Sequence, residues 1–334
     1  MVRLQMSSLA VARGAHGVMR GGSVALAVIA QVLSDVFRYL AKESNVPNAL
    51  FATSPRNVSE TFPLEVTMDW WSDSCWLIID LWSKGWLLYA VVNIIVRADL
   101  GPEIHPAVFY LSWTAINVAR ICLMYLWDKH DLLGAVILGW VPPFLGFYML
   151  YVSCSNLRAH EAWLAVNRPR ALSWTRYLTQ NGLAAFAWWS LLNAVLGLGI
   201  VLKYRARVPD PLTSTFVLTV VSSCIIIWFI LQSCLLAKYM RYVFSVYAIL
   251  IVGLGAMFTR SYRLHDLAAN TVYCGFLMLL MTIMNSIHSV STCLSADESN
   301  KPAAAEPSAT SKGRETVWHT DLRGPDVKNG PFKI

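Results

Sequence analysis

The chain has 334 residues, of which 56% are apolar and only 14% are charged, whereas a soluble globular domain carries about 25% charged residues. The mean hydropathy is +0.49, and stretches of about 20 apolar residues, each able to cross a ~30 Å hydrocarbon core, recur along the chain. This composition excludes a soluble enzyme and predicts an all-α, polytopic membrane protein. The net charge of +7 does not indicate a nucleic-acid partner, because the cations lie scattered between apolar spans.

Hydropathy divides the chain into spans and flanking segments. A basic segment covers residues 1–22, and the tail over residues 294–334 is rich in Pro, Ala, Ser, Lys and Glu, a composition that predicts disorder. Between these segments we expect about eight membrane-spanning helices, the fourth kinked by Pro142-Pro143. The predicted spans are residues 23–41, 74–97, 105–127, 132–153, 182–203, 213–236, 240–259 and 268–291.

The first span has two interpretations. Its apolar stretch ends at Leu33, after which Asp35 and Arg38 interrupt it, and the residues before it are basic. That pattern fits a retained helix, but it is also typical of a signal peptide or an organellar transit peptide. If the first span is a cleaved signal, seven helices remain.

Loop charges predict the orientation in the membrane. The acidic loop over residues 42–73 contains Asn57-Val58-Ser59, the only N-x-[ST] acceptor in the chain, so we expect a glycan on Asn57 and an extracytoplasmic loop. The loop over residues 154–181 carries four arginines and a single acid, which favours the cytoplasmic side. Eight spans then place the C-terminus in the cytoplasm. We expect the protein to lie in the plasma membrane or an endomembrane.

Three ionisable side chains lie inside predicted spans: Asp80, Lys84 and Arg120. Asp80 and Lys84 are i,i+4 neighbours in the order that favours an intrahelical ion pair. Arg120 requires an anion at membrane depth, and Asp80 on the neighbouring span is the expected partner. Such a cluster either locks helices together or handles a ligand or a proton.

No sequence pattern indicates catalysis. The chain shows no HExxH, P-loop, glycine-rich phosphate loop or Ser/His/Asp spacing, and its seven cysteines include no CxxC pair that would hold zinc. We therefore expect neither an enzyme nor a bound metal or cofactor.

The tryptophans carry a resemblance to a known family. Five of the 14 tryptophans lie between Trp70 and Trp86, and this segment resembles the second helix of the tryptophan-rich sensory protein/peripheral benzodiazepine receptor (TspO/MBR) family. Asn117 followed by Tyr125-Leu126-Trp127 is similar to that family's third helix, and the run from Ala185 to Asn193, which includes Trp189, is similar to its fifth. The chain departs from the family at Met68, Trp70 and Asp73, which replace its proline, glycine and phenylalanine.

The resemblance implies a five-helix unit over residues 23–205, extended by three helices over residues 206–293. It also implies a hydrophobic or planar ligand, such as a tetrapyrrole or a sterol, that the protein binds and then transports or senses. Indole faces would stack on such a ligand and asparagine amides would orient it. The predicted pocket residues are Trp71, Trp76, Trp82, Trp86, Asn117, Trp189 and Asn193.

Two alternatives belong to other classes of protein. A cleaved first span would leave a seven-helix, receptor-like protein with a glycosylated extracellular N-terminus. The intramembrane charges Asp80, Lys84 and Arg120 would instead suit a proton or substrate transporter.

Overall fold

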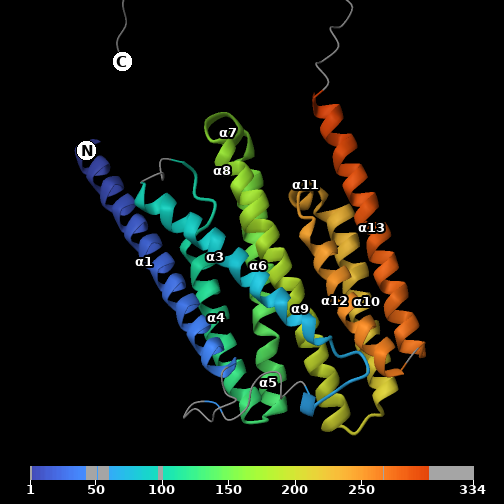
Figure 1. Ribbon diagram of the computed structural model, residues 1–334. Helices are drawn as coiled ribbons and strands as arrows, with labels where there is room; N and C mark the ends of the chain where they lie inside the picture. The colour runs from blue at the N-terminus through green and yellow to red at the C-terminus, as the bar shows by residue number, and fades with distance from the viewer. Residues whose placement is uncertain (1, 43–50, 52–59, 97–100, 266, 301–334) are drawn as a thin grey trace, which may run out of the picture. The chain divides into compact units, whose positions relative to one another are not determined.

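The computed structural model describes residues 2–42, 51, 60–96, 101–265 and 267–300 (Figure 1). The described residues form helices and connecting segments without a β-strand. Eight of these helical stretches are long and apolar enough to cross a membrane, which confirms the predicted all-α, polytopic bundle. They cover Gly17–Ala41, Trp70–Ile95, Ala107–Asp128, Leu132–Ala159, Pro169–Tyr204, Asp210–Leu235, Ser245–Leu264 and Ala269–Val290.

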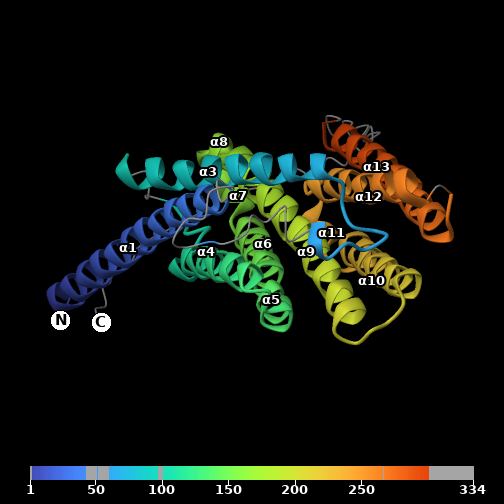
Figure 2. The ribbon, with the colours of Figure 1, turned by 60° about the horizontal axis from the view of Figure 1, so that its bottom comes forward.

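The first helix belongs to the bundle. Helix α1 (Val2–Lys42) packs along α4 (Ala107–Asp128) and also contacts α3 (Asp73–Ile95). Its buried face carries the small residues Ala27 and Ala30, which let helix backbones approach closely. In Figures 1 and 2, α3 crosses obliquely past α4, α6 and α9 instead of running parallel to them.

The fourth span is broken, as the two prolines predict. It consists of α5 (Leu132–Gly139) and α6 (Val141–Ala159), which meet at Trp140. Pro142 and Pro143 lie in the first turn of α6, where their missing N–H groups cost no helical hydrogen bond. Farther along α6, a Cβ atom at Gly146 would lie 3.0 Å from the Cβ of Ala187, so this glycine permits the close contact between α6 and α9.

Helix α9 (Asn181–Tyr204) is the central element of the core. Every residue from Asn181 to Leu192 is buried, because α9 contacts α3, α5, α6, α10 (Asp210–Ile230) and α12 (Ser245–His265). A helix that is apolar on all sides is expected in such a position. The hydrophobic core therefore continues from the first five spans into the last three.

Short elements connect the long helices. The 3₁₀ turn η1 (Trp70–Ser72) precedes α3, and α7 (Glu161–Asn167) and α8 (Pro169–Trp174) follow α6. Two π-helical segments, η2 (Thr175–Gln180) and η3 (Leu231–Leu235), adjoin α9 and α10. Helices α11 (Ala237–Met240), α12 and α13 (Ala269–Asn300) complete the described chain.

Candidate functional site

A buried carboxylate joins three helices. Asp80 on α3 is 2% exposed, and its Oδ1 accepts a hydrogen bond of 2.9 Å from the Nη2 of Arg120 on α4. Its other oxygen, Oδ2, pairs with Arg38 on α1. The expected pairing of Arg120 with Asp80 is confirmed. Arg38 is an additional partner, although in the sequence its charge only interrupts the apolar stretch of the first span.

Lys84 has a different partner from the one its spacing predicts. Its Nζ lies 2.9 Å from the Oδ2 of Asp35 on α1, so the pair is interhelical and not the intrahelical pair with Asp80. The amide of Gln31 donates to Asp35 Oδ1 over 3.3 Å and accepts from the Trp113 indole over 3.2 Å. Because α1 packs against α3 and α4, its own charges supply partners that are far away in sequence.

Five charged side chains make these ion pairs: Asp80 pairs with Arg38 and Arg120, and Asp35 pairs with Lys84. We call the five side chains together the charge network. Breaking a buried ion pair leaves an uncompensated charge and is strongly destabilising. The Arg120 guanidinium also lies 5.3 Å from the centroid of the Trp76 ring, which gives a cation–π contact. The arrangement holds α1, α3 and α4 together.

The tryptophans of α3 face several different partners. Trp76 makes edge contacts with Phe186 and Trp189 of α9, at centroid distances of 6.4 and 6.5 Å. Trp86 makes an edge contact with Trp113 at 5.0 Å. These rings fill the core and pack against each other.

Two other tryptophans of the predicted ligand pocket contact neighbouring elements. The Trp71 indole donates to Thr259 Oγ1 on α12 over 3.3 Å. Trp82 packs on α9 at Gly182, where a Cβ atom would lie 2.9 Å from Trp82 Cδ1. Trp71 in η1 and Trp82 on α3 therefore contact separate parts of the bundle.

The two asparagines of the predicted ligand pocket do not face a common space. Asn117 is fully buried and donates to the Trp113 carbonyl over 3.0 Å, whereas Asn193 is exposed and donates to the Trp189 carbonyl of its own helix over 2.7 Å. Trp189 itself is 1% exposed in the core. Asn57, the predicted glycan acceptor, lies outside the described residues.

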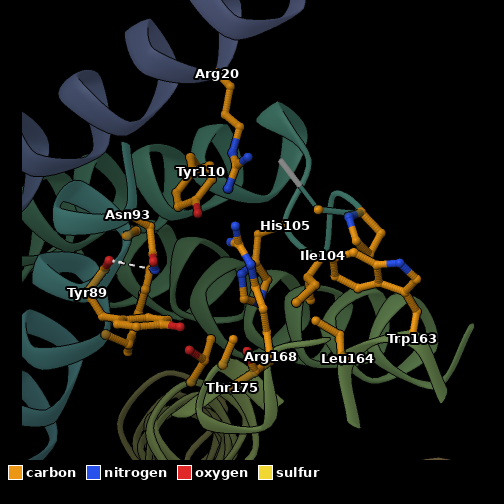
Figure 3. Close-up of a pocket in the computed structure, with 16 residues that line it drawn as sticks. Arg20, Tyr89, Asn93, Ile104, His105, Tyr110, Trp163, Leu164, Arg168 and Thr175 are labelled. Atoms are coloured by element: carbon orange, nitrogen blue, oxygen red, sulfur yellow. Dashed lines mark hydrogen bonds between the residues drawn. The ribbon is translucent and has the colours of Figure 1, made fainter. Parts of the chain in front are cut away.

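A cavity of about 70 Å³ lies elsewhere, at one end of the bundle. Its walls come from α1, α3, α4 with the segment that precedes it, α7, α8 and η2. Trp86 is the member of the predicted pocket set that lines it. Four aromatic side chains surround the space together with two arginines and a histidine (Figure 3). These residues are Trp86, Tyr89, Tyr110, Trp163, Arg20, Arg168 and His105.

The cavity lies at the level where the spans end. Arg20 is near the start of the first span, Tyr89 and Asn93 are near the end of the second, and His105 lies two residues before the third. Arg168 directly precedes the fifth span. A cavity built from the ends of spans lies near the boundary between hydrocarbon and headgroups.

The cationic side chains that line the cavity are its two arginines. His105 Nε2 lies 3.0 Å from Ser153 Oγ, and burial, with a smaller contribution from the charge of Arg20, lowers the pKa of His105 to about 3. The imidazole is therefore neutral at physiological pH. Figure 3 shows Arg20 and Arg168 extending from opposite walls toward the space beside His105 and Tyr110.

A π-helical segment forms another wall. Thr175 and Thr179, both in η2, line the cavity, and π-helical turns inside longer helices occur frequently at functional sites. The irregular backbone is supported by Asn181, whose amide donates to the Arg176 carbonyl and to the Tyr242 carbonyl, each over 2.9 Å.

No sequence pattern singles out Arg20, Arg168, His105 or Trp163. In the sequence, Arg20 belongs to the basic residues before the first span and Arg168 to the four arginines of the loop over residues 154–181. No local pattern links these residues, because they come from separate segments that only the packing brings together.

The fold and the charges define an integral membrane helical bundle with a basic, aromatic cavity at one end. Comparison of the chain with protein-family models, with curated proteins and with solved structures gave no match. The resemblance to the TspO/MBR family stays a prediction from the tryptophan and asparagine positions.

Proposed function

We propose that this membrane protein binds an anionic amphipathic ligand in the cavity at the end of the bundle. The observation that carries the proposal is the lining: aromatic rings form the walls, and the guanidinium groups of Arg20 and Arg168 extend into the same space. Aromatic walls suit the apolar part of a ligand, and guanidinium groups suit an anion. Trp86 also presents an indole N–H that is buried and has no hydrogen-bond partner among the described residues.

The size of the cavity limits what enters it. Its volume is about 70 Å³, whereas pockets that enclose a drug-sized ligand measure about 300–1,000 Å³. The cavity therefore accepts the polar end of a ligand, while the remainder lies along the apolar helix surfaces. Of the two predicted ligand types, a tetrapyrrole bearing carboxylates matches the arginines better than a sterol, whose single hydroxyl is neutral.

Two observations bear on the alternative classes. Helix α1 supplies Arg20 to the cavity, and Asp35 and Arg38 to the charge network. Cleavage of the first span as a signal peptide would remove all three, which favours the eight-helix form over a seven-helix receptor. The paired state of Asp80, Lys84 and Arg120 favours a structural lock over a transport pathway.

Fluorescence quenching tests the proposal. Protoporphyrin titrated into the purified full-length protein in detergent is expected to quench tryptophan emission with saturation. Trp163→Ala, which removes an aromatic wall, is expected to weaken binding by about 1–3 kcal/mol if indole stacking resembles base–aromatic stacking.

Trp70→Ala is the matched control, because Trp70 is 64% exposed and does not line the cavity. Its affinity for protoporphyrin is expected to equal that of the wild type. Non-saturable quenching, or equal weakening by both substitutions, would contradict binding at the cavity.

A further inference from the structure

Lys84 is a charged side chain on the outer surface of a membrane span. It lies near the middle of the second span, Trp70–Ile95, and its side chain is 47% exposed. Helix α3, which carries it, passes in front of α4, α6 and α9 in Figure 1 and lies along one edge of the bundle in Figure 2. Ionisable side chains within membrane spans almost always face the protein interior or a water-filled cavity. The exposed position of Lys84 therefore calls for a partner outside the bundle.

The ion pair of Lys84 lies within the hydrocarbon region. Its partner Asp35 is six residues from Ile29, the midpoint of the first span Gly17–Ala41, which is about 9 Å along the helix axis at 1.5 Å per residue. Half of the hydrocarbon core measures about 15 Å. Arg120, in the same charge network, is near the middle of the third span, Ala107–Asp128. All three spans thus place these charges deeper than the lipid headgroups.

The charge network contains one cation more than it has carboxylates. Asp80 pairs with Arg38 and Arg120, and Asp35 pairs with Lys84. These are the ion pairs that the five side chains make within the described chain, so three positive charges share two negative charges. Because a net charge within the membrane is costly, the network requires one further anion. Lys84 can bind it, since an ammonium group has three N–H donors and its side chain is the most exposed of the five.

The surface around Lys84 is apolar. Leu81 and Leu88 lie one helical turn before and after it on α3, and both are exposed. On α1, which contacts α3, Val32 lies one turn before Asp35 and is exposed as well. We call the surface formed by Val32, Asp35, Leu81, Lys84 and Leu88 the α1–α3 face. An apolar surface with an excess positive charge at membrane depth is complementary to an apolar helix that carries one acidic residue.

We propose that a transmembrane helix of another protein packs against the α1–α3 face and places a carboxylate beside Lys84. The added carboxylate balances the third cation of the charge network, and the apolar side chains of the partner helix cover Leu81, Leu88 and Val32. A second copy of this chain does not meet this requirement, because its own α1–α3 face brings the same excess cation. The interaction does not depend on the cavity at the end of the bundle.

Fluorescence energy transfer in liposomes of phosphatidylcholine tests the proposal. The labelled full-length protein is combined with labelled transmembrane peptides of leucine and alanine that carry a single glutamate, glutamine or lysine at the centre, at mildly alkaline pH to keep the glutamate ionised. The glutamate peptide is expected to associate at least tenfold more strongly than the other two. Tenfold corresponds to about 1.4 kcal/mol, a size typical of polar contacts between model membrane helices.

Three variants locate the contact. Lys84→Met is expected to lower association of the glutamate peptide to the level of the glutamine peptide, whereas Lys84→Arg, which keeps the charge, is expected to retain the preference. Lys129→Met is the matched control, because Lys129 has a similarly exposed side chain (52%) but directly follows the end of the third span. This variant is expected to bind the glutamate peptide within twofold of the wild type.

Equal association of the glutamate and glutamine peptides with the wild type would overturn the proposal, as would equal weakening by Lys84→Met and Lys129→Met. Two differently labelled samples of the protein, reconstituted together, test the second copy as the occupant. Self-association that Lys84→Met abolishes would assign the α1–α3 face to a dimer and would also overturn the proposal.

Discussion

Two clusters of arginines in this protein have opposite surroundings, although they share helix α1. Arg38 and Arg120 meet the buried carboxylate of Asp80, whereas Arg20 and Arg168 line a cavity in which no described lining residue is acidic. Along α1, Arg20 and Arg38 are about 27 Å apart at 1.5 Å per residue. At membrane depth a cation requires a neutralising group within the protein, whereas a cation at the end of a span also lies within reach of water and lipid headgroups.

The largest expected effect comes from breaking the charge network. Asp80→Ala leaves Arg38 and Arg120 without their shared carboxylate, and removal of one member of a buried ion pair costs about 3–5 kcal/mol. Thermal unfolding of the protein in detergent, compared with that of the wild type, measures this loss. Asp80→Ala combined with Arg120→Ala is expected to recover part of the stability. Wild-type stability of the single variant would show that Asp80 does not neutralise these arginines.

The pH dependence of stability distinguishes the cavity from the network. The pKa of His105 is about 3 in the folded protein against 6.5 in the unfolded chain. Between these values the unfolded chain binds a proton that the folded protein does not, so the free energy of unfolding falls as the pH decreases below about 6.5.

His105→Gln is expected to flatten this part of the pH profile, measured as the unfolding midpoint of both proteins between neutral and acidic pH. The carboxylates titrate in both proteins, so the difference between the two profiles isolates His105. Parallel profiles would mean that His105 is not buried in a neutral state.

The smallest effect is expected at the edge of the network. Lys84 pairs with Asp35, but its side chain is 47% exposed, and exposed ion pairs contribute only about 0–1 kcal/mol. Lys84→Met is therefore expected to change the unfolding midpoint far less than Asp80→Ala does in the same assay. A loss of stability as large as that of Asp80→Ala would show that Lys84 stabilises the charge network as strongly as Asp80 does.

The sequence predicted the part of this protein that depends on local composition. All eight spans follow from apolar stretches of sufficient length, and the break at Trp140 follows from two consecutive prolines that cannot donate hydrogen bonds. The pairing of Asp80 with Arg120 was also predictable, because a buried arginine on one span needs an anion and Asp80 was the carboxylate expected on the neighbouring span.

The tertiary structure decided which side chains meet. The angular positions of residues on α3 do not reveal that α1 lies beside it. In the sequence, Asp35 and Arg38 therefore look like interruptions of a span. In the structure Asp35 pairs with Lys84, and Arg38 pairs with Asp80. The same holds for the cavity, whose two arginines are 148 residues apart in the chain. Hydropathy is a property of neighbouring residues and is visible in the sequence, whereas an ion pair or a cavity between helices exists only once their crossing and rotation have been set by packing.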